Sequence, residues 1–146
     1  MSIIKTNKFQ TLAGQTNQIV LQVVNYYFNS QTVTTSASWA DTGLTATITP
    51  YFATSKILVT VNDAQGSNSG YANLRLLRNG SVLVQHGVSV GYSGTLYPGT
   101  MGHQYLDSPA TTTAVTYKTQ FYAANGTIRY NYDGSYSSIT LLEIAQ

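Results

Sequence analysis

The feature that most limits how this chain can fold is the alternation of β-branched and aromatic residues with polar ones. Thr, Val, Ile and Tyr dominate the runs between turn signals, and such side chains favour the pleated, half-buried surface of a strand. No stretch of about twelve residues has the apolar spacing of 3.6 that an amphipathic helix requires. The predicted strands are residues 18–24, 25–35, 44–49, 56–62, 71–78, 81–86, 101–107, 114–123, 127–132 and 137–144.

Turn signals separate these runs. Asn79-Gly80 and Asn125-Gly126 each predict a two-residue hairpin, because both central positions of that turn have a positive φ. Asp133-Gly134 marks a further turn. Polar or glycine-rich composition predicts loops at residues 63–70, 87–102 and 108–113. Many short strands with regular turns predict an all-β fold, either an antiparallel β-sandwich or a jelly roll.

The 146 residues suit one domain with an N-terminal extension. Residues 1–17 are polar and poor in strand signals, so we expect a short extended arm that docks on another protein. Its candidate docking residues are Ile3, Ile4 and Phe9. Residues 18–146 then form the sandwich head.

The scarcity of charged residues and the shortness of the apolar runs exclude two classes of partner, nucleic acids and the membrane interior. Only 8% of the residues are charged, and the seven Lys and Arg residues are scattered. Nucleic-acid binding relies on clustered basic residues, so we expect no nucleic-acid partner. The longest apolar runs are far too short to cross a bilayer as a helix, so we expect no membrane insertion.

Catalytic and metal motifs are weak. Residues 87–91 match G-x-S-x-G, but no acid lies between Ser89 and His103, the last histidine. The order Ser, acid, His that this motif requires is therefore missing. His86 and His103 lack metal-ligand spacing. We expect a non-enzymatic protein with no cofactor and no metal.

The last predicted strand is apolar on both faces. Ile139 and Leu141 point one way, and Leu142 and Ile144 point the other. One face is expected to pack the core and the other a neighbouring subunit; a mid-sheet strand covered by a loop is the alternative. The candidate oligomer-interface residues are Tyr130, Tyr132, Ile139, Leu141 and Glu143.

Glu143 is a lone charge inside this apolar strand. It either emerges at the rim of the sheet or is buried against Arg75 or Arg129, because an unpaired buried charge is costly.

Tyrosine is abundant, with twelve copies. Its ring and hydroxyl suit recognition surfaces at low entropic cost. Tyr92, Tyr97, His103 and Tyr105 are therefore the candidate contacts to a host or ligand, with a surface glycan as the expected ligand. Tyrosine is also a good strand former, so a core or subunit-interface role is the alternative, favoured for Tyr130 and Tyr132.

Several segments occur in an order that resembles the small fibre-type virion proteins of tailed bacteriophages, especially marine phages that infect cyanobacteria. These segments include residues 5–11 (KTNKFQT), 19–24 (IVLQVV), 76–80 (LLRNG), 106–110 (LDSPA) and 138–144 (SITLLEI). The resemblance implies a jelly-roll head similar to the tumour-necrosis-factor and complement globular-head folds. It also implies a homotrimer without enzymatic activity or cofactor.

The expected function is that of a virion structural protein, assembled in the host cytoplasm and displayed on the particle as a fibre-type adhesin for host recognition. The arm is expected to bind another virion protein of the capsid, portal adaptor or tail. The alternative is a capsid decoration or cement protein that stabilises the head lattice.

Overall fold

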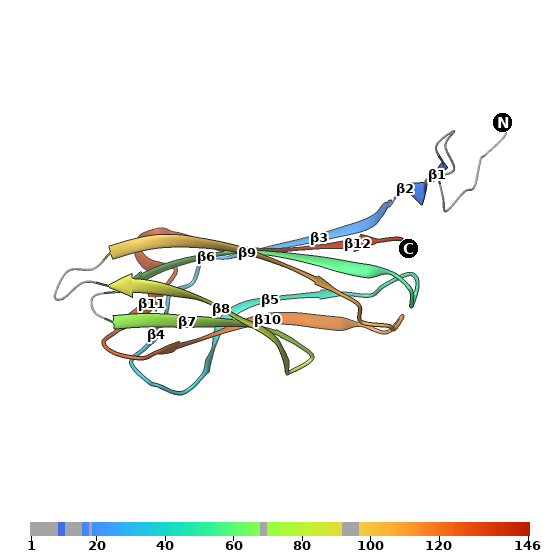
Figure 1. Cartoon of the computed structure of the whole chain (residues 1–146). Helices are drawn as coiled ribbons and strands as arrows, with labels where there is room; N and C mark the ends of the chain where they lie inside the picture. The colour runs from blue at the N-terminus through green and yellow to red at the C-terminus, as the bar shows by residue number, and fades with distance from the viewer. Residues whose placement is uncertain (1–8, 11–15, 18, 68–69, 92–96) are drawn as a thin grey trace.

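The computed structural model describes residues 9–10, 16–17, 19–67, 70–91 and 97–146, with side chains for 19–67, 71–85 and 98–146. No α-helix occurs in these ranges (Figure 1). The elements are β1 (Phe9–Gln10), β2 (Thr16–Asn17), β3 (Val20–Phe28), β4 (Thr32–Thr34), β5 (Ala40–Ile48), β6 (Lys56–Ser67), β7 (Gly70–Arg78), β8 (Ser81–Gly91), β9 (Tyr97–Asp107), β10 (Val115–Ala123), β11 (Ile128–Tyr130), the 3₁₀ turn η1 (Tyr132–Gly134) and β12 (Ser137–Ile144).

Two antiparallel sheets pack face to face (Figure 1). The first has the order β3-β12-β6-β9, and the second has the order β5-β10-β7-β8. Strand β9 pairs with β6 along its whole length, while β12 and then β11 follow one another along the other edge of β6. Strand β4 pairs with β11. The prediction of an all-β, antiparallel sandwich is therefore confirmed.

The inward side chains of both sheets fill the space between them. Along each strand these inward side chains alternate with outward ones. Buried and half-buried residues alternate at every position of β10 and β12. The inward set includes Leu44, Leu74, Phe121, Ile139 and Leu141, all fully buried. Alternation with a period of two gives each strand one face toward the core.

Four of the five residues predicted to form an oligomer interface are instead buried within a single chain, which corrects the prediction for them. Tyr130, Ile139, Leu141 and Glu143 have no exposed surface, so they cannot contact a neighbouring copy. The prediction that this strand has two apolar faces holds, but the inward face is the one that carries Ile139 and Leu141. Tyr132 lies half-buried in η1.

Two turns follow the predicted chemistry and one does not. Asn79 (φ 47°) and Gly80 (φ 85°) join β7 to β8 in a tight hairpin. Asp133 (φ 55°) and Gly134 (φ 74°) turn the chain within η1. Asn125-Gly126 joins β10 in one sheet to β11 in the other, so its predicted hairpin pairing is wrong.

Two of the predicted loops are shorter than expected. Strand β6 continues to Ser67, and β8 and β9 extend to Gly91 and from Tyr97. The pairing of Ile57–Ser67 with Tyr97–Asp107 explains the lengths of β6 and β9, and the pairing of Gly70–Arg78 with Ser81–Gly91 explains that of β8. Cross-strand pairing overrides the weak strand preference of glycine and polar residues. Residues 108–113 form no strand, as predicted.

The predicted arm contains a small sheet of its own. Strands β1 and β2 pair with each other in antiparallel fashion. They lie beyond the end of the sandwich at which β3 begins (Figure 1). Phe9 belongs to β1, while Ile3 and Ile4 lie outside the described residues.

Leu141→Ala tests which face of β12 packs the core. We expect this substitution to lower the free energy of unfolding by about 2–5 kcal/mol, because a buried leucine leaves a cavity when truncated. Chemical denaturation would measure the change. The control is Val82→Ala, which truncates a half-exposed apolar side chain on β8 and should change stability by less than about 0.5 kcal/mol. Equal losses would contradict the assignment.

Candidate functional site

An apolar row crosses the outer face of the first sheet. Val23 lies opposite Leu142, Leu142 opposite Leu58, and Leu58 opposite Leu106. The row therefore takes one residue from each of the four strands. Val23 and Leu106 are half-exposed, and Leu58 and Leu142 are half-buried. In the sequence these four residues lie far apart, so only the register of the sheet brings them together.

The apolar row extends toward the start of β3. Ile144 pairs with both Val20 and Lys56, and Val20 is half-exposed. Monomeric proteins rarely leave a contiguous apolar patch of this kind open to water.

The outer face of the second sheet is polar by contrast. Lys118 Nζ lies 2.8 Å from Asp41 Oδ2, and Gln120 donates to Asp41 Oδ1 (2.6 Å). Arg75 donates two hydrogen bonds to Gln120 and stacks 4.2 Å above the Trp39 ring. Burial raises the pKa of Asp41, but the hydrogen bonds from Lys118 and Gln120 outweigh it and hold that pKa below its ordinary value. The charged and polar groups of these side chains therefore find their hydrogen-bond and ion-pair partners on the same face.

A polar row borders the apolar row on the outer face of the first sheet. Asn25 lies opposite Thr140, Thr140 opposite Thr60, and Thr60 opposite Gln104. The Asn25 amide donates to Thr140 Oγ1 (2.6 Å). This row separates the apolar row from the half of the sheet that leads to η1.

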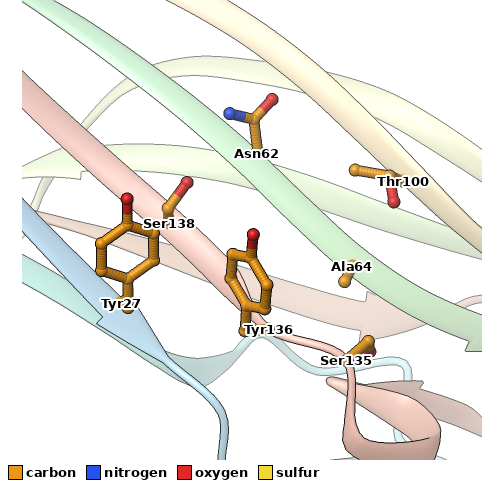
Figure 2. Close-up of a pocket in the computed structure, with 7 residues that line it drawn as sticks. All are labelled: Tyr27, Asn62, Ala64, Thr100, Ser135, Tyr136 and Ser138. Atoms are coloured by element: carbon orange, nitrogen blue, oxygen red, sulfur yellow. The ribbon is translucent and has the colours of Figure 1, made fainter.

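Beyond the polar row the surface is hollowed. A hollow of about 530 Å³ lies over β3, β12, β6 and β9 (Figure 2). The rings of Tyr27 and Tyr136 stand side by side at its edge, with centroids 5.5 Å apart and planes at 72°. The other lining residues are Asn62, Ala64, Thr100, Ser135 and Ser138. None of the lining side chains is charged.

A titratable cluster lies inside the sandwich rather than in this hollow. Asp63, fully buried on β6, accepts a hydrogen bond from the Tyr130 hydroxyl. His103 Nδ1 lies 3.6 Å from Asp63 Oδ2. Burial raises the pKa of Asp63 to about 7, although the Tyr130 hydrogen bond opposes this change. Burial and the neighbouring Asp63 also raise the pKa of Tyr130.

The predicted host-contact residues are not displayed together. His103 and Tyr105 lie on the inward side of β9, where Tyr105 packs against the core and only 11% of the His103 side chain is exposed. Alternation along β9 turns both away from the outer face, which corrects the prediction for these two. Tyr92 and the side chain of Tyr97 lie outside the described residues.

Glu143 is buried without an arginine. Gln22 Nε2 donates to its Oε2 (2.6 Å), and the backbone N–H groups of Tyr51 and Phe52 donate to its Oε1 (2.8 and 3.3 Å). Burial raises the pKa of Glu143, but these hydrogen bonds outweigh it and lower that pKa below its ordinary value. Neither the predicted rim position nor a pair with Arg75 or Arg129 is correct. The carboxylate instead holds the connection between β5 and β6.

Neither Tyr27 nor Tyr136 is among the contact residues predicted from the sequence. The signal available was the Tyr26-Tyr27 pair next to a strand end. Tyr27 and Tyr136 come into contact because Ser138 of β12 pairs with Tyr27 of β3. A pairing between such distant strands cannot be predicted from a local sequence pattern.

No protein-family model matches the chain, and no curated protein matches it. In the described part of the chain, no helix is long and apolar enough to span a membrane. The same residues contain no group of three or more His, Cys, Asp or Glu side chains placed to hold a metal ion.

The buried Asp63 predicts a loss of stability as the pH rises. Its pKa is about 7 in the fold against an ordinary 3.8, so the folded state binds the proton more tightly. This contribution is complete below about pH 4 and is lost as the pH rises through about 7. Asp63→Asn removes the titration, so the stability of the variant relative to the natural chain should increase over that range, by about 1.4 kcal/mol per pKa unit. Urea denaturation between pH 4 and pH 8 measures this.

Glu143→Gln is the control with the opposite sign. The lowered pKa of Glu143 stabilises the fold above the ordinary value of 4.5, and this stability is lost as the pH falls through the folded pKa. The variant should therefore lose this acid-side dependence and keep the slope between pH 4 and pH 7. Parallel curves for Asp63→Asn and the natural chain would contradict the role of Asp63.

Proposed function

We propose that this chain is a non-enzymatic structural protein of a tailed-phage particle, a jelly-roll head that assembles as a homotrimer and presents a recognition surface. The single observation that carries the proposal is the apolar row on the outer face of one sheet, beside a second sheet whose outer face is polar. Such a row is stabilised when another copy removes it from water, at about 25 cal/mol per Å² of apolar surface.

The pairing of the strands supports the jelly-roll assignment. The eight long strands pair first with last and so on inward: β3 with β12, β5 with β10, β6 with β9, and β7 with β8. This nested order describes one long hairpin rolled into two sheets, which is the plan of a jelly roll. Viral capsid and lectin domains are built on that plan.

The position of the titratable groups supports a non-enzymatic role. Asp63 and Tyr130 meet inside the core, where a substrate has no access, and the hollow of Figure 2 is lined by neutral side chains. An acid–base mechanism needs such groups within reach of the substrate.

The arm is proposed to dock the head on another virion protein of the capsid, portal adaptor or tail. Strands β1 and β2 form a sheet of their own at the end where β3 begins. The outer face near η1 is at the other end of β3, so docking and recognition would use opposite ends of the head.

Light scattering of dilute, purified protein tests the assembly. We expect a mass three times that of the 15.8 kDa chain. Leu106→Ser places a hydroxyl in the apolar row and should shift the protein toward the single-chain mass, because the interface loses apolar area. The control Val82→Ser changes a similarly exposed side chain on the other sheet and should leave the mass unchanged. A single-chain mass for the natural protein, with cooperative unfolding, would overturn the proposal.

A further inference from the structure

The hollow beside Tyr27 and Tyr136 is one of three that adjoin on the outer face of the first sheet. A hollow of about 380 Å³ shares both tyrosines with it, and one of about 400 Å³ shares Asn62. We call the three together the tyrosine groove. It runs from β3 across β12 and β6 to β9. Besides the residues named for Figure 2, its lining comprises Asn29, Thr60, Gly102, Gln104 and Gly134. Val61 and His103 also border it, although their side chains lie on the inward faces of β6 and β9.

The lining of the tyrosine groove combines two kinds of chemistry. Tyr27 is 63% exposed and Tyr136 is 61% exposed, so both rings offer apolar surface to a ligand. Figure 2 shows the amide of Asn62 and the hydroxyls of Thr100 and Ser138 around the same hollow. Amide and hydroxyl groups donate and accept hydrogen bonds. The matching ligand has apolar C–H faces and many hydroxyls.

The absence of charged lysine, arginine, aspartate and glutamate side chains from the groove lining further limits the class of ligand. No Lys, Arg, Asp or Glu lines any of the three hollows. A carboxylated, sulfated or phosphorylated ligand would find no lysine or arginine among these residues to pair with its charge. The groove therefore fits a neutral ligand.

The shape favours a chain of rings rather than one ring. Three adjoining hollows that cross four strands provide successive subsites, with the tyrosine pair between the first two. Gly102 leaves room for the Asn62 side chain on the surface of the paired strands β6 and β9, because a Cβ at this position would lie 3.0 Å from Asn62 Oδ1.

We propose that the tyrosine groove binds a neutral oligosaccharide, with sugar faces stacked on Tyr27 and Tyr136 and sugar hydroxyls bonded by Asn62, Thr100 and Ser138. This inference rests on the proposed function in one respect: a recognition head needs a ligand site, and the groove supplies it. The polar row, of which Thr60 and Gln104 also line the groove, lies between the tyrosine pair and the apolar row, so trimerisation and the stacking of sugar faces use different parts of the outer face.

Isothermal titration of the full chain with cellopentaose, maltopentaose and mannopentaose tests the proposal, with an oligogalacturonide as the acidic comparison. We expect at least one neutral pentasaccharide to bind at millimolar concentration or better, and more tightly than the acidic one. Tyr27→Ala and Tyr136→Ala should each weaken that binding tenfold or more, equivalent to about 1.4 kcal/mol per factor of ten. Both side chains are exposed, so thermal melts should be unchanged.

Two further variants sharpen the test. Tyr51→Ala removes a tyrosine with the same 63% exposure outside the groove and should leave binding unchanged. Gly102→Ala pushes on Asn62 and should weaken the pentasaccharide more than the corresponding disaccharide. No binding by any neutral pentasaccharide, full binding by Tyr27→Ala, or an equal loss in Tyr51→Ala would overturn the proposal.

The mass of each variant separates this proposal from the assembly. A trimer that binds no sugar refutes the groove alone, and a single chain that binds sugar refutes the trimer alone. If Tyr27→Ala or Tyr136→Ala dissociates the trimer, the groove is covered by a neighbouring copy and the sugar proposal is wrong.

Discussion

The pairing of β6 on both edges is the constraint on which the rest of the structure depends. Strand β9 occupies one edge over eleven residue pairs, and β12 and β11 share the other. The pairing register with these neighbouring strands turns every second side chain of β6 toward the other sheet and the remaining side chains toward the outer face. The inward residues Ile57, Val59 and Val61 begin the core, while Leu58 and Asn62 belong to the apolar row and the groove. A slip of one residue would exchange these roles.

The inner face of β6 changes character along its length, from apolar side chains to Asp63, Gln65 and Ser67, all buried. Burying a polar group is costly unless a partner is supplied. Tyr130 supplies one for Asp63, whereas neither the amide nitrogen nor the amide oxygen of Gln65 has a hydrogen-bond partner among the described residues. At the opposite end of β9, the Asp107 carboxylate receives Arg78 (2.8 and 2.9 Å) and the Tyr117 hydroxyl (2.6 Å). Asp107 lies in the first sheet and its two donors lie in the second, so this network joins the two sheets at that end of the sandwich.

The two outer faces of the sandwich differ in the kind of side chain that they expose. On the second sheet, Asp41, Lys118, Gln120 and Arg75 bind one another, so these four polar side chains find their partners within the chain. On the first sheet, the apolar row leaves Val20, Val23 and Leu106 half-exposed, and the tyrosine groove offers rings and hydroxyls. The polar row lies between the apolar row and the tyrosine pair, and contributes Thr60 and Gln104 to the groove, so the proposed subunit contact and the proposed stacking of sugars use separate areas. One face can therefore serve both without competition.

The sequence by itself determined the class of the fold, because alternation and turn residues act locally. Asn79-Gly80 needs only its own positive φ values to form a hairpin, and the two apolar sets of β12 are visible in the residues themselves. Tertiary structure decided which set faces inward, and so why Ile139 and Leu141 are core while Leu142 is not. It also decided that Glu143 binds backbone N–H groups instead of an arginine, that Asn125-Gly126 joins two sheets, and that Tyr27 meets Tyr136. Each depends on register between distant strands, which is set by the packing of the whole sandwich and leaves no local trace.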